Sequence, residues 1–245
     1  MNGTIAIVTG AGQGFGLALT AALAARGSRV VACSRDADRL LAATAGLPGV
    51  VALPGDITDP EFRAELVSTA WRLDLLVHNA GELGPSPLPS LEHFPLDALR
   101  GVLETTVLAP LALTQLALPL LRSSTAGTVI TLSSDAAVEA YPGWGGYGAA
   151  KAALDHVSAV LAVEEPALRV YAFDPGDMRT AMHQRAFPGE DISDRPDPMT
   201  VVPALMRLLD RRPESGRYRA ADLMDDGQQA QRAPGTPDRP AGSTA

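Results

Sequence analysis

The sequence predicts an α/β fold: a single doubly wound parallel sheet with helices on both faces. Short apolar segments alternate with longer helical segments along most of the chain. The apolar segments are continuous rather than alternately polar, as in strands that are covered on both faces. The 245 residues are enough for one sizeable core, and neither a second core nor an internal repeat is visible.

The elements follow one another in the order that such a sheet requires. We expect strands at 5–8, 29–33, 50–53, 73–78, 128–132 and 169–173, with a weaker one at 216–220. Helices are expected at 15–25, 36–45, 60–70, 96–121, 147–164 and 200–210. Residues 183–199 are rich in proline, glycine and acid and are expected to form a long loop or small lid. We therefore expect one domain over 1–224, and a disordered tail over 225–245 because that segment is polar and proline-rich.

The first strand, a glycine-rich turn, a helix and the second strand form one βαβ unit. The helix is alanine-rich and is followed by Gly27, a common helix stop. The turn contains Gly10, Gly12, Gly14 and Gly16, which fit the pattern T-G-x-x-x-G-x-G and not G-x-G-x-x-G. Glycines allow the backbone to approach a pyrophosphate, and the helix N-terminus offers free N–H groups. The unit therefore predicts a dinucleotide site.

Composition excludes several other classes of function. The net charge of −8 argues against a nucleic-acid surface or an anionic membrane as partner. Cys33 is the only cysteine, and the four histidines lack metal-ligand spacing, so we expect neither an internal disulfide nor a metal. The apolar stretch 107–121 is too short to span a bilayer and is expected to be a buried helix. The first strand begins at the fifth residue, with no signal peptide before it, and we expect a cytoplasmic protein.

Tyr147 and Lys151 are spaced to act together on one helix face. Four residues separate them, which corresponds to about 6 Å along the helix axis. A neighbouring cation favours the phenolate and is expected to lower the tyrosine pKa towards the working range, which suits proton transfer. Ser134 follows the fifth strand, where its hydroxyl could bind a substrate carbonyl, and Ser133 is the competing candidate.

These residues belong to a longer series of motifs that resembles the short-chain dehydrogenase/reductase family. The series runs Thr9-Gly10-x-x-x-Gly14-x-Gly16, Asn79-Ala80-Gly81, Ser134, Tyr147-x-x-x-Lys151 and Pro175-Gly176, at the separations of that family, and the resemblance covers roughly residues 3 to 220. It implies a Rossmann-like fold with Ser134 orienting the carbonyl and Tyr147 as the acid/base. Lys151 would tune the tyrosine and bind the nicotinamide ribose. The family's fourth helix carries a relay asparagine where this chain has Thr106, beside Thr105; the threonine could hold a water by a shorter arm, or the relay is impaired.

The resemblance also implies a set of cofactor-binding residues: Gly10, Gly14, Phe15, Gly16, Ser34, Arg35, Asp56, Ile57, Asn79, Ala80, Gly81, Tyr147, Lys151, Pro175, Gly176 and Thr180. Asn79 is expected to brace the sheet, and His78 before it to serve packing. At the end of the second strand, a hydroxyl and a guanidinium replace the carboxylate that would bind a free 2′-hydroxyl. Ser34 and Arg35 suit a 2′-phosphate, so NADP(H) is favoured over NAD(H), while Asp36 is expected to cap the next helix.

The substrate is less well defined. Five loop residues could form an apolar pocket wall or could pack a lid onto the core: Tyr141, Trp144, Met178, Met182 and Phe187. Asp135, Glu139 and Asp177 would disfavour an anionic substrate, while Asp174 and Asp177, which flank the Pro175-Gly176 turn, are expected to be solvated.

We therefore expect an oxidoreductase that transfers hydride between NADP(H) and a carbonyl or alcohol of a small or medium, neutral molecule. A non-catalytic NADP(H)-binding sensor or scaffold, or an epimerase or dehydratase on the same fold, remain the alternatives. The apolar helix 96–121 and the helix after Tyr147 resemble family dimer elements, so we expect a homodimer rather than a tetramer.

Overall fold

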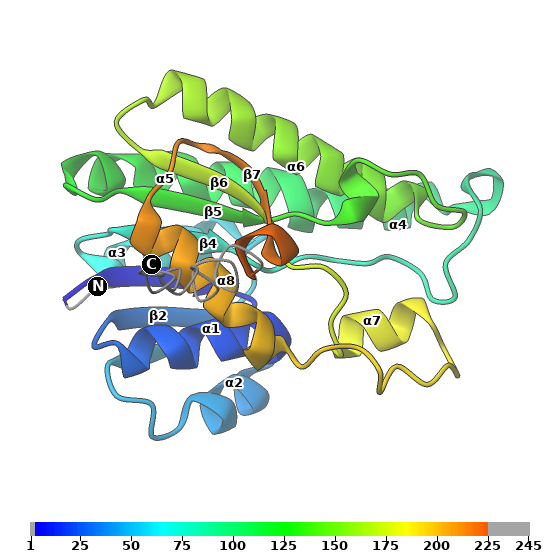
Figure 1. Cartoon of the computed structure of the whole chain (residues 1–245), viewed down its shortest axis with the longest axis horizontal. Coiled ribbons are helices and arrows are strands. Elements are labelled where there is room, and N and C mark those ends of the chain that lie inside the picture. Colours follow the sequence, from blue (N-terminus) through cyan, green and yellow to red (C-terminus); the bar gives the residue numbers. More distant parts are fainter. Residues whose placement is uncertain (1–2, 225–245) are drawn as a thin grey trace, which may run out of the picture.

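A seven-stranded, fully parallel sheet organises the protein, and the computed structural model describes residues 3–224. The strand order is β3-β2-β1-β4-β5-β6-β7, so the order reverses between β1 and β4. Ligands of open parallel sheets bind outside the carboxyl ends of the strands at such a reversal. Figure 1 shows the layered body and the separate α7 segment, which projects to the right of it.

Because all the strands run in the same direction, the loops that follow their carboxyl ends lie at one edge of the sheet. The strands are β1 Ile5–Thr9, β2 Arg29–Ser34, β3 Val50–Pro54, β4 Leu75–His78, β5 Thr128–Leu132, β6 Arg169–Asp174 and β7 Gly216–Arg219. The α-helices are α1 Gly14–Ala25, α2 Ala37–Thr44, α3 Pro60–Ala70, α4 Leu96–Leu103, α5 Ala109–Ser123, α6 Gly145–Glu164, α7 Ala181–Ala186 and α8 Pro198–Arg211. A π-helical segment, η2 Glu104–Leu108, joins α4 to α5, and two 3₁₀ turns are η1 Leu91–His93 and η3 Asp135–Ala137.

Two hydrophobic layers sandwich the sheet because alternate residues of each strand face opposite sides. In β1, Ala6 and Val8 pack with α1 and α8, whereas Ile5 and Ile7 pack with α3 and α5. Both layers consist mainly of buried aliphatic side chains, with a few aromatic rings among them. Their burial, at about 25 cal/mol per Å² of apolar area, is the main stabilising contribution. The fold class predicted from the sequence is confirmed.

The predicted helix 96–121 is continuous but not uniform. It runs over Leu96–Ser123, and the π-helical segment interrupts the α-helix at Thr105 and Thr106. By length and composition alone this 28-residue helix could cross a membrane, whereas the apolar stretch 107–121 is too short to do so. Half of its most apolar window is buried inside the fold, as in a core helix.

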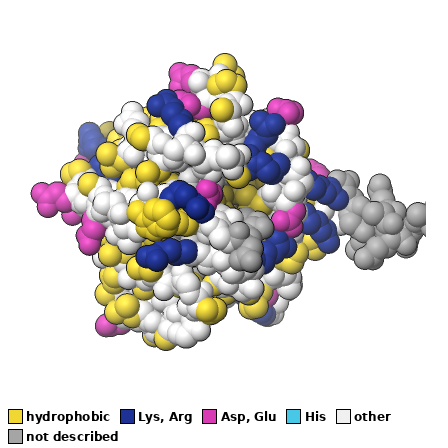
Figure 2. Space-filling view, turned by 90° about the vertical axis from the view of Figure 1, so that its left-hand side faces the viewer, with side chains coloured by type: hydrophobic (Ala, Val, Ile, Leu, Met, Phe, Trp, Pro, Cys, Tyr) yellow, Lys and Arg dark blue, Asp and Glu magenta, His cyan; other side chains and the backbone are white. Residues whose placement is uncertain are grey.

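The region 183–199 was predicted to be a loop or lid and is only partly so. Residues Ala181–Ala186 form α7, whose first turn is capped by the Thr180 hydroxyl accepting from the His183 amide. The helix is too short to show an amphipathic period, which is why the sequence pattern missed it. The predicted tail 225–245 lies outside the described residues. On the face opposite α7, basic, acidic and apolar side chains are interspersed (Figure 2).

Candidate active site

The glycine turn after β1 forms one wall of a cleft of about 350 Å³. Gly10 and Gly14 have φ values of +67° and +56°, which other residues rarely adopt. The N-cap residue of α1, Gln13, makes no side-chain hydrogen bond to the helix, and the first turn carries no acidic residue. The first-turn amides of α1 therefore face the cleft without a side-chain cap, as an anion-binding helix end requires.

Gly16 has a structural task instead. It does not line the cleft, and a Cβ at this position would collide with the side-chain amide of Asn79 and the carbonyl of Gly10. Asn79 donates to the carbonyls of Thr9 and Gly10, at 2.9 and 3.0 Å. Asn79 thus ties the β1 turn to the end of β4, the bracing role that we expected.

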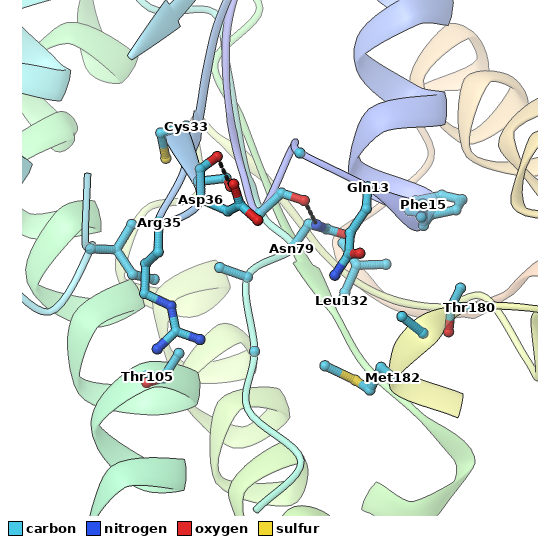
Figure 3. A pocket seen from close by; sticks show the side chains of 18 of the residues that line it. Gln13, Phe15, Cys33, Arg35, Asp36, Asn79, Thr105, Leu132, Thr180 and Met182 are labelled. Carbon is cyan, nitrogen blue, oxygen red and sulfur yellow. Dashed lines mark hydrogen bonds between the residues drawn. The ribbon is translucent and has the colours of Figure 1, made fainter. Parts of the chain in front are cut away.

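Two arginines follow β2, one directly after the strand and one in α2, where only the first was anticipated. The Arg35 side chain is 63% exposed, lies 3.4 Å from Glu82 and points along the cleft towards Thr105 (Figure 3). Arg39 lines the same cleft and donates to Gln13 at 2.8 Å. Asp36 caps α2 by accepting from the Arg39 amide, as predicted. The cleft therefore presents two guanidinium groups beside Ser34.

The remaining predicted cofactor residues fall into three groups. Lining the cleft are Gly10, Gly14, Phe15, Ser34, Arg35, Asp56, Ile57, Asn79, Ala80, Gly81, Tyr147, Lys151, Pro175 and Thr180. Gly176 lines a neighbouring cavity, and Gly16 lines neither. Gln13, Arg39, Thr105, Met178 and Met182 line the cleft although the sequence analysis did not place them there. Thr180 and Met182 come from the α7 segment, on the side of the cleft away from Arg35 (Figure 3).

Ser134, Tyr147 and Lys151 are brought together where the cleft meets a second cavity of about 440 Å³. Tyr147 lines both cavities, Ser134 lines the second, and Lys151 lines the first. The Lys151 ammonium lies 5.5 Å from the centroid of the Tyr147 ring. Ser133 donates to Asp155 at 2.6 Å and is 97% buried, since only 3% of it is exposed. The Ser134 hydroxyl is engaged as well, since it donates to Asp135 at 2.8 Å and accepts from the Ala136 amide at 3.2 Å. What distinguishes Ser134 is its hydrogen bond with the Tyr147 hydroxyl.

The electrostatics of the pair differ from the expectation. Burial raises the pKa of the Tyr147 hydroxyl well above its usual value, a hydrogen bond with Ser134 opposes this, and Asp135, Asp174 and Asp177 raise the pKa further. The Lys151 ammonium donates to the Leu132 carbonyl rather than to the phenol. Tyr147 is therefore a protonated phenol at neutral pH, and the predicted shift towards the working range is absent.

Lys151 is the only lysine of the sequence, and 4% of it is exposed. Burial lowers its pKa to about 8, while Asp155 and Asp174 pull it in the opposite direction. Thr106 is fully buried and lies across Gly81 from the lysine: a Cβ on Gly81 would be 3.7 Å from Lys151 Nζ and 3.9 Å from Thr106 Oγ1. Thr106 accepts from the Glu82 amide at 3.4 Å and does not line the cleft, whereas Thr105 does. The π-helical segment brings both threonines to this end of the site.

The second cavity has aromatic walls and an acidic rim. Tyr141, Trp144, Met178, Met182 and Phe187 all line it, which supports the pocket-wall interpretation. The Trp144 ring packs edge-on against Tyr147, with centroids 5.6 Å apart. Asp135 and Asp177 also line the cavity, whereas Glu139 does not.

Asp174 corrects one expectation. It was expected to be solvated, but only 3% of it is exposed. One oxygen accepts from the Gly176 amide at 3.0 Å, and the other accepts from Arg217 at 2.9 Å. Asp177 is exposed as expected and lies 3.7 Å from His183. The sequence placed Arg217 on a weak strand and gave no sign that it reaches this carboxylate.

His78 lies where a packing role places it. His78 is buried on β4 and bonded to Thr114 at 2.8 Å, and burial lowers its pKa to about 3. No cluster of three metal-ligating side chains occurs within residues 3–224.

A parallel sheet with an uncapped glycine turn, a guanidinium pair and a Ser–Tyr–Lys set at one edge defines a dinucleotide-binding oxidoreductase. Comparison with known proteins specifies the family. The short chain dehydrogenase family model matches residues 4–191. The oxidoreductase YciK of Escherichia coli is 31% identical over 221 residues, 85% of this chain and 87% of YciK.

Two further relatives agree. The L-fucose dehydrogenase of Bos taurus is 35% identical over 210 residues, 82% of this chain and 73% of that enzyme. The crystal structure of a short chain dehydrogenase of Shigella flexneri complexed with NADP has a TM-score of 0.81 and 31% identity, covering 90% of this chain and 98% of the other. The chain belongs to the short-chain dehydrogenase family and is an oxidoreductase with that family's NAD(P)-binding Rossmann fold.

Proposed function

We propose that the protein reduces a carbonyl group of a small or medium, neutral molecule with hydride from NADPH. The observation that carries this proposal is the meeting of Ser134, Tyr147 and Lys151 at the junction of the dinucleotide cleft and an aromatic cavity. The relative solved with NADP supports the choice of cofactor, together with Arg35 and Arg39 at the end of β2.

The residues of the cleft fit a dinucleotide phosphate. The α1 amides carry no competing side-chain cap, and Gly10 and Gly14 keep the approach to them free of Cβ atoms. Arg35 and Arg39 would hold a 2′-phosphate by charge-assisted hydrogen bonds. Lys151 would hold the ribose beside the nicotinamide. The bound, reduced nicotinamide supplies the hydride, and the protein supplies binding, orientation and the proton.

The protonated Tyr147 phenol carries the proton that reduction of a carbonyl needs. The Ser134 hydroxyl, which donates to Asp135 at 2.8 Å without a substrate, would turn to donate its hydrogen bond to the substrate carbonyl oxygen and orient it. The Tyr147 hydroxyl would then give its proton to the same oxygen as the carbonyl carbon accepts hydride, so that an alcohol forms. The raised pKa keeps the phenol protonated at neutral pH but also makes it a weaker acid, so the proton transfer would depend on the neighbouring Lys151 cation to stabilise the phenolate that forms. The reverse reaction, which needs the phenolate as base, would require alkaline conditions.

A screen of neutral aldehydes and ketones with NADPH, followed by absorbance at 340 nm, tests this proposal. Tyr147→Phe should abolish turnover while NADPH still binds, and Tyr218→Phe, outside both cavities, should leave it unchanged. Full activity of Tyr147→Phe would overturn the assignment of the acid. Binding of NADPH without turnover of any carbonyl would favour the sensor alternative, to which the enclosed Thr106 also points.

We further propose a homodimer through α5 and α6. Four apolar side chains of α5, α6 and the adjoining end of η2 are substantially exposed: Leu108 (53%), Leu116 (44%), Val160 (42%) and Val163 (81%). A second copy that covered them would remove this area from water.

A further inference from the structure

Arg217 joins three elements behind the proposed active site. Its Nη2 donates to the backbone carbonyl of Ser134 and to Asp174 Oδ2, both at 2.9 Å. Its Nε donates to Asp155 Oδ2 at 3.2 Å. Arg217 belongs to β7, Asp155 to α6 and Asp174 to the end of β6. One guanidinium thus binds a loop, a helix and a strand end at the same time.

The partners of Arg217 continue directly into the site. Asp174 accepts from the Gly176 amide with its second oxygen, and Asp155 accepts from the Ser133 hydroxyl. The segments bearing Ser134 and Gly176 both line the aromatic cavity, whereas Arg217 lines neither cavity. Arg217 therefore acts on the site only through other residues.

The charges in this region are closely balanced. The side chains of Asp155 and Asp174 are 15% and 4% exposed, and Arg217 is 26% exposed. Both carboxylates also stabilise the Lys151 ammonium. Loss of the guanidinium would leave Asp174 charged, buried and bonded only to an amide, which is costly. Both carboxylates would then act on Lys151 with nothing to offset them.

We propose that Arg217 is a positioning residue that fixes the Ser134 and Gly176 segments and balances the two carboxylates behind the Tyr147–Lys151 pair. The effect on turnover rests on the proposed function, while the effect on Lys151 does not. A planar guanidinium can bind three acceptors in fixed directions, and a lysine ammonium cannot reproduce that arrangement.

The electrostatic half can be measured without a substrate. Because Lys151 is the only lysine, ¹³Cε-lysine labelling gives one resonance whose titration reports its pKa. The charged or titratable groups around it are Tyr147 and Asp155 on its own helix, Asp174 on β6 and Arg217 on β7. Arg217→Gln removes a positive charge and frees both carboxylates, so the Lys151 pKa should rise above its value of about 8. Arg219→Gln, an exposed change on the same strand, should leave the titration unchanged.

The positioning half is measured with a carbonyl found in the screen. In Arg217→Gln and Arg217→Lys, kcat should fall about tenfold or more because Ser134 is misplaced. Faster amide exchange at Gly176 should accompany both changes.

An unchanged Lys151 titration in Arg217→Gln, or wild-type kcat in either variant, would overturn the proposal. Should Arg217→Gln fail to fold, the proposal is tested with Arg217→Lys, which keeps the positive charge. The measurements are then kcat and amide exchange at Gly176. Should no carbonyl be turned over, the proposed function fails, but the Lys151 titration and Gly176 exchange still decide the role of Arg217.

Discussion

Arg35→Gln tests how the protein would choose between the two nicotinamide cofactors. The change keeps most of the side-chain length and removes the positive charge at the end of β2. We expect the Kd for NADPH to rise while the Kd for NADH stays nearly constant, because only NADPH carries the 2′-phosphate.

The expected change in the Kd for NADPH follows from the hydrogen bond that Arg35 would make to the 2′-phosphate and from the contact with Glu82 that it would give up. A hydrogen bond between charged groups contributes about 1.5–3 kcal/mol, which corresponds to roughly a tenfold to hundredfold change in Kd. Giving up the contact with Glu82 would reduce this binding energy only slightly, because that contact is 3.4 Å long and the Arg35 side chain is 63% exposed. Exposed pairs of this kind contribute about 0–1 kcal/mol. Arg39 would retain part of the phosphate binding, so the lower half of the range is the expected result.

Fluorescence titration of NADPH and NADH against both proteins measures the two constants. Arg29→Gln is the matched control, because Arg29 is exposed at the opposite end of the same strand. The reasoning is refuted if Arg35→Gln weakens both cofactors equally, or if the wild-type protein binds NADH more tightly than NADPH. Raising the salt concentration should weaken NADPH more than NADH, because the contact is largely exposed.

Three further predictions concern stability and assembly. Gly16→Ala should lower the unfolding free energy by about 1–3 kcal/mol, read from denaturant unfolding, because the new methyl group collides with Asn79; normal stability would contradict the packing role. The pKa of His78 is about 6.5 in the unfolded chain and about 3 in the folded protein. The stability that comes from burying the neutral imidazole is therefore intact above pH 6.5 and is lost as the pH falls towards 3. Between these two pH values the unfolding free energy of the wild-type protein should therefore fall by up to about 1.4 kcal/mol per pH unit more than that of His78→Asn. Parallel pH profiles of the two proteins would refute this. Leu116→Glu should convert a dimer to monomers in sedimentation velocity, Leu41→Glu on α2 should not, and a dimer that survives Leu116→Glu would exclude the α5 surface.

The fold could be predicted because its signals are local. A strand buried on both faces shows a continuous apolar run, and a helix shows its period, so the order of elements is visible without any tertiary information. The π-helical segment at Thr105 and Thr106 has no such signal, since one extra residue per turn leaves the composition unchanged. Residues 183–186 of α7 were assigned to a loop for a different reason, because a six-residue helix is too short to show an amphipathic period.

The sequence predicted those residues of the proposed site that follow strand ends or share a helix. It did not predict residues that reach the site only through long-range strand pairing. Ser134, Tyr147 and Lys151 have informative spacing because the first follows β5 and the other two share α6. Arg39 could have been anticipated, since it lies one turn into the helix that follows Arg35. Arg217 could not, because its approach to Asp174 depends on β7 pairing in register with β6, at a separation of 43 residues.

The arrangement of charge explains why an arginine-rich chain keeps its only lysine at this position. Arginine remains charged at any accessible pH, whereas burial lowers the pKa of Lys151 to about 8, within reach of proton exchange. The ammonium is also compact enough to lie against the Leu132 carbonyl and beside Gly81, where a guanidinium would need more room. Burial alone would drive the lysine towards its neutral form, and Asp155 and Asp174 prevent this. Arg217 binds the same two carboxylates and offsets their negative charge. The buried Lys151 ammonium and the partly buried Arg217 guanidinium therefore share one pair of carboxylates.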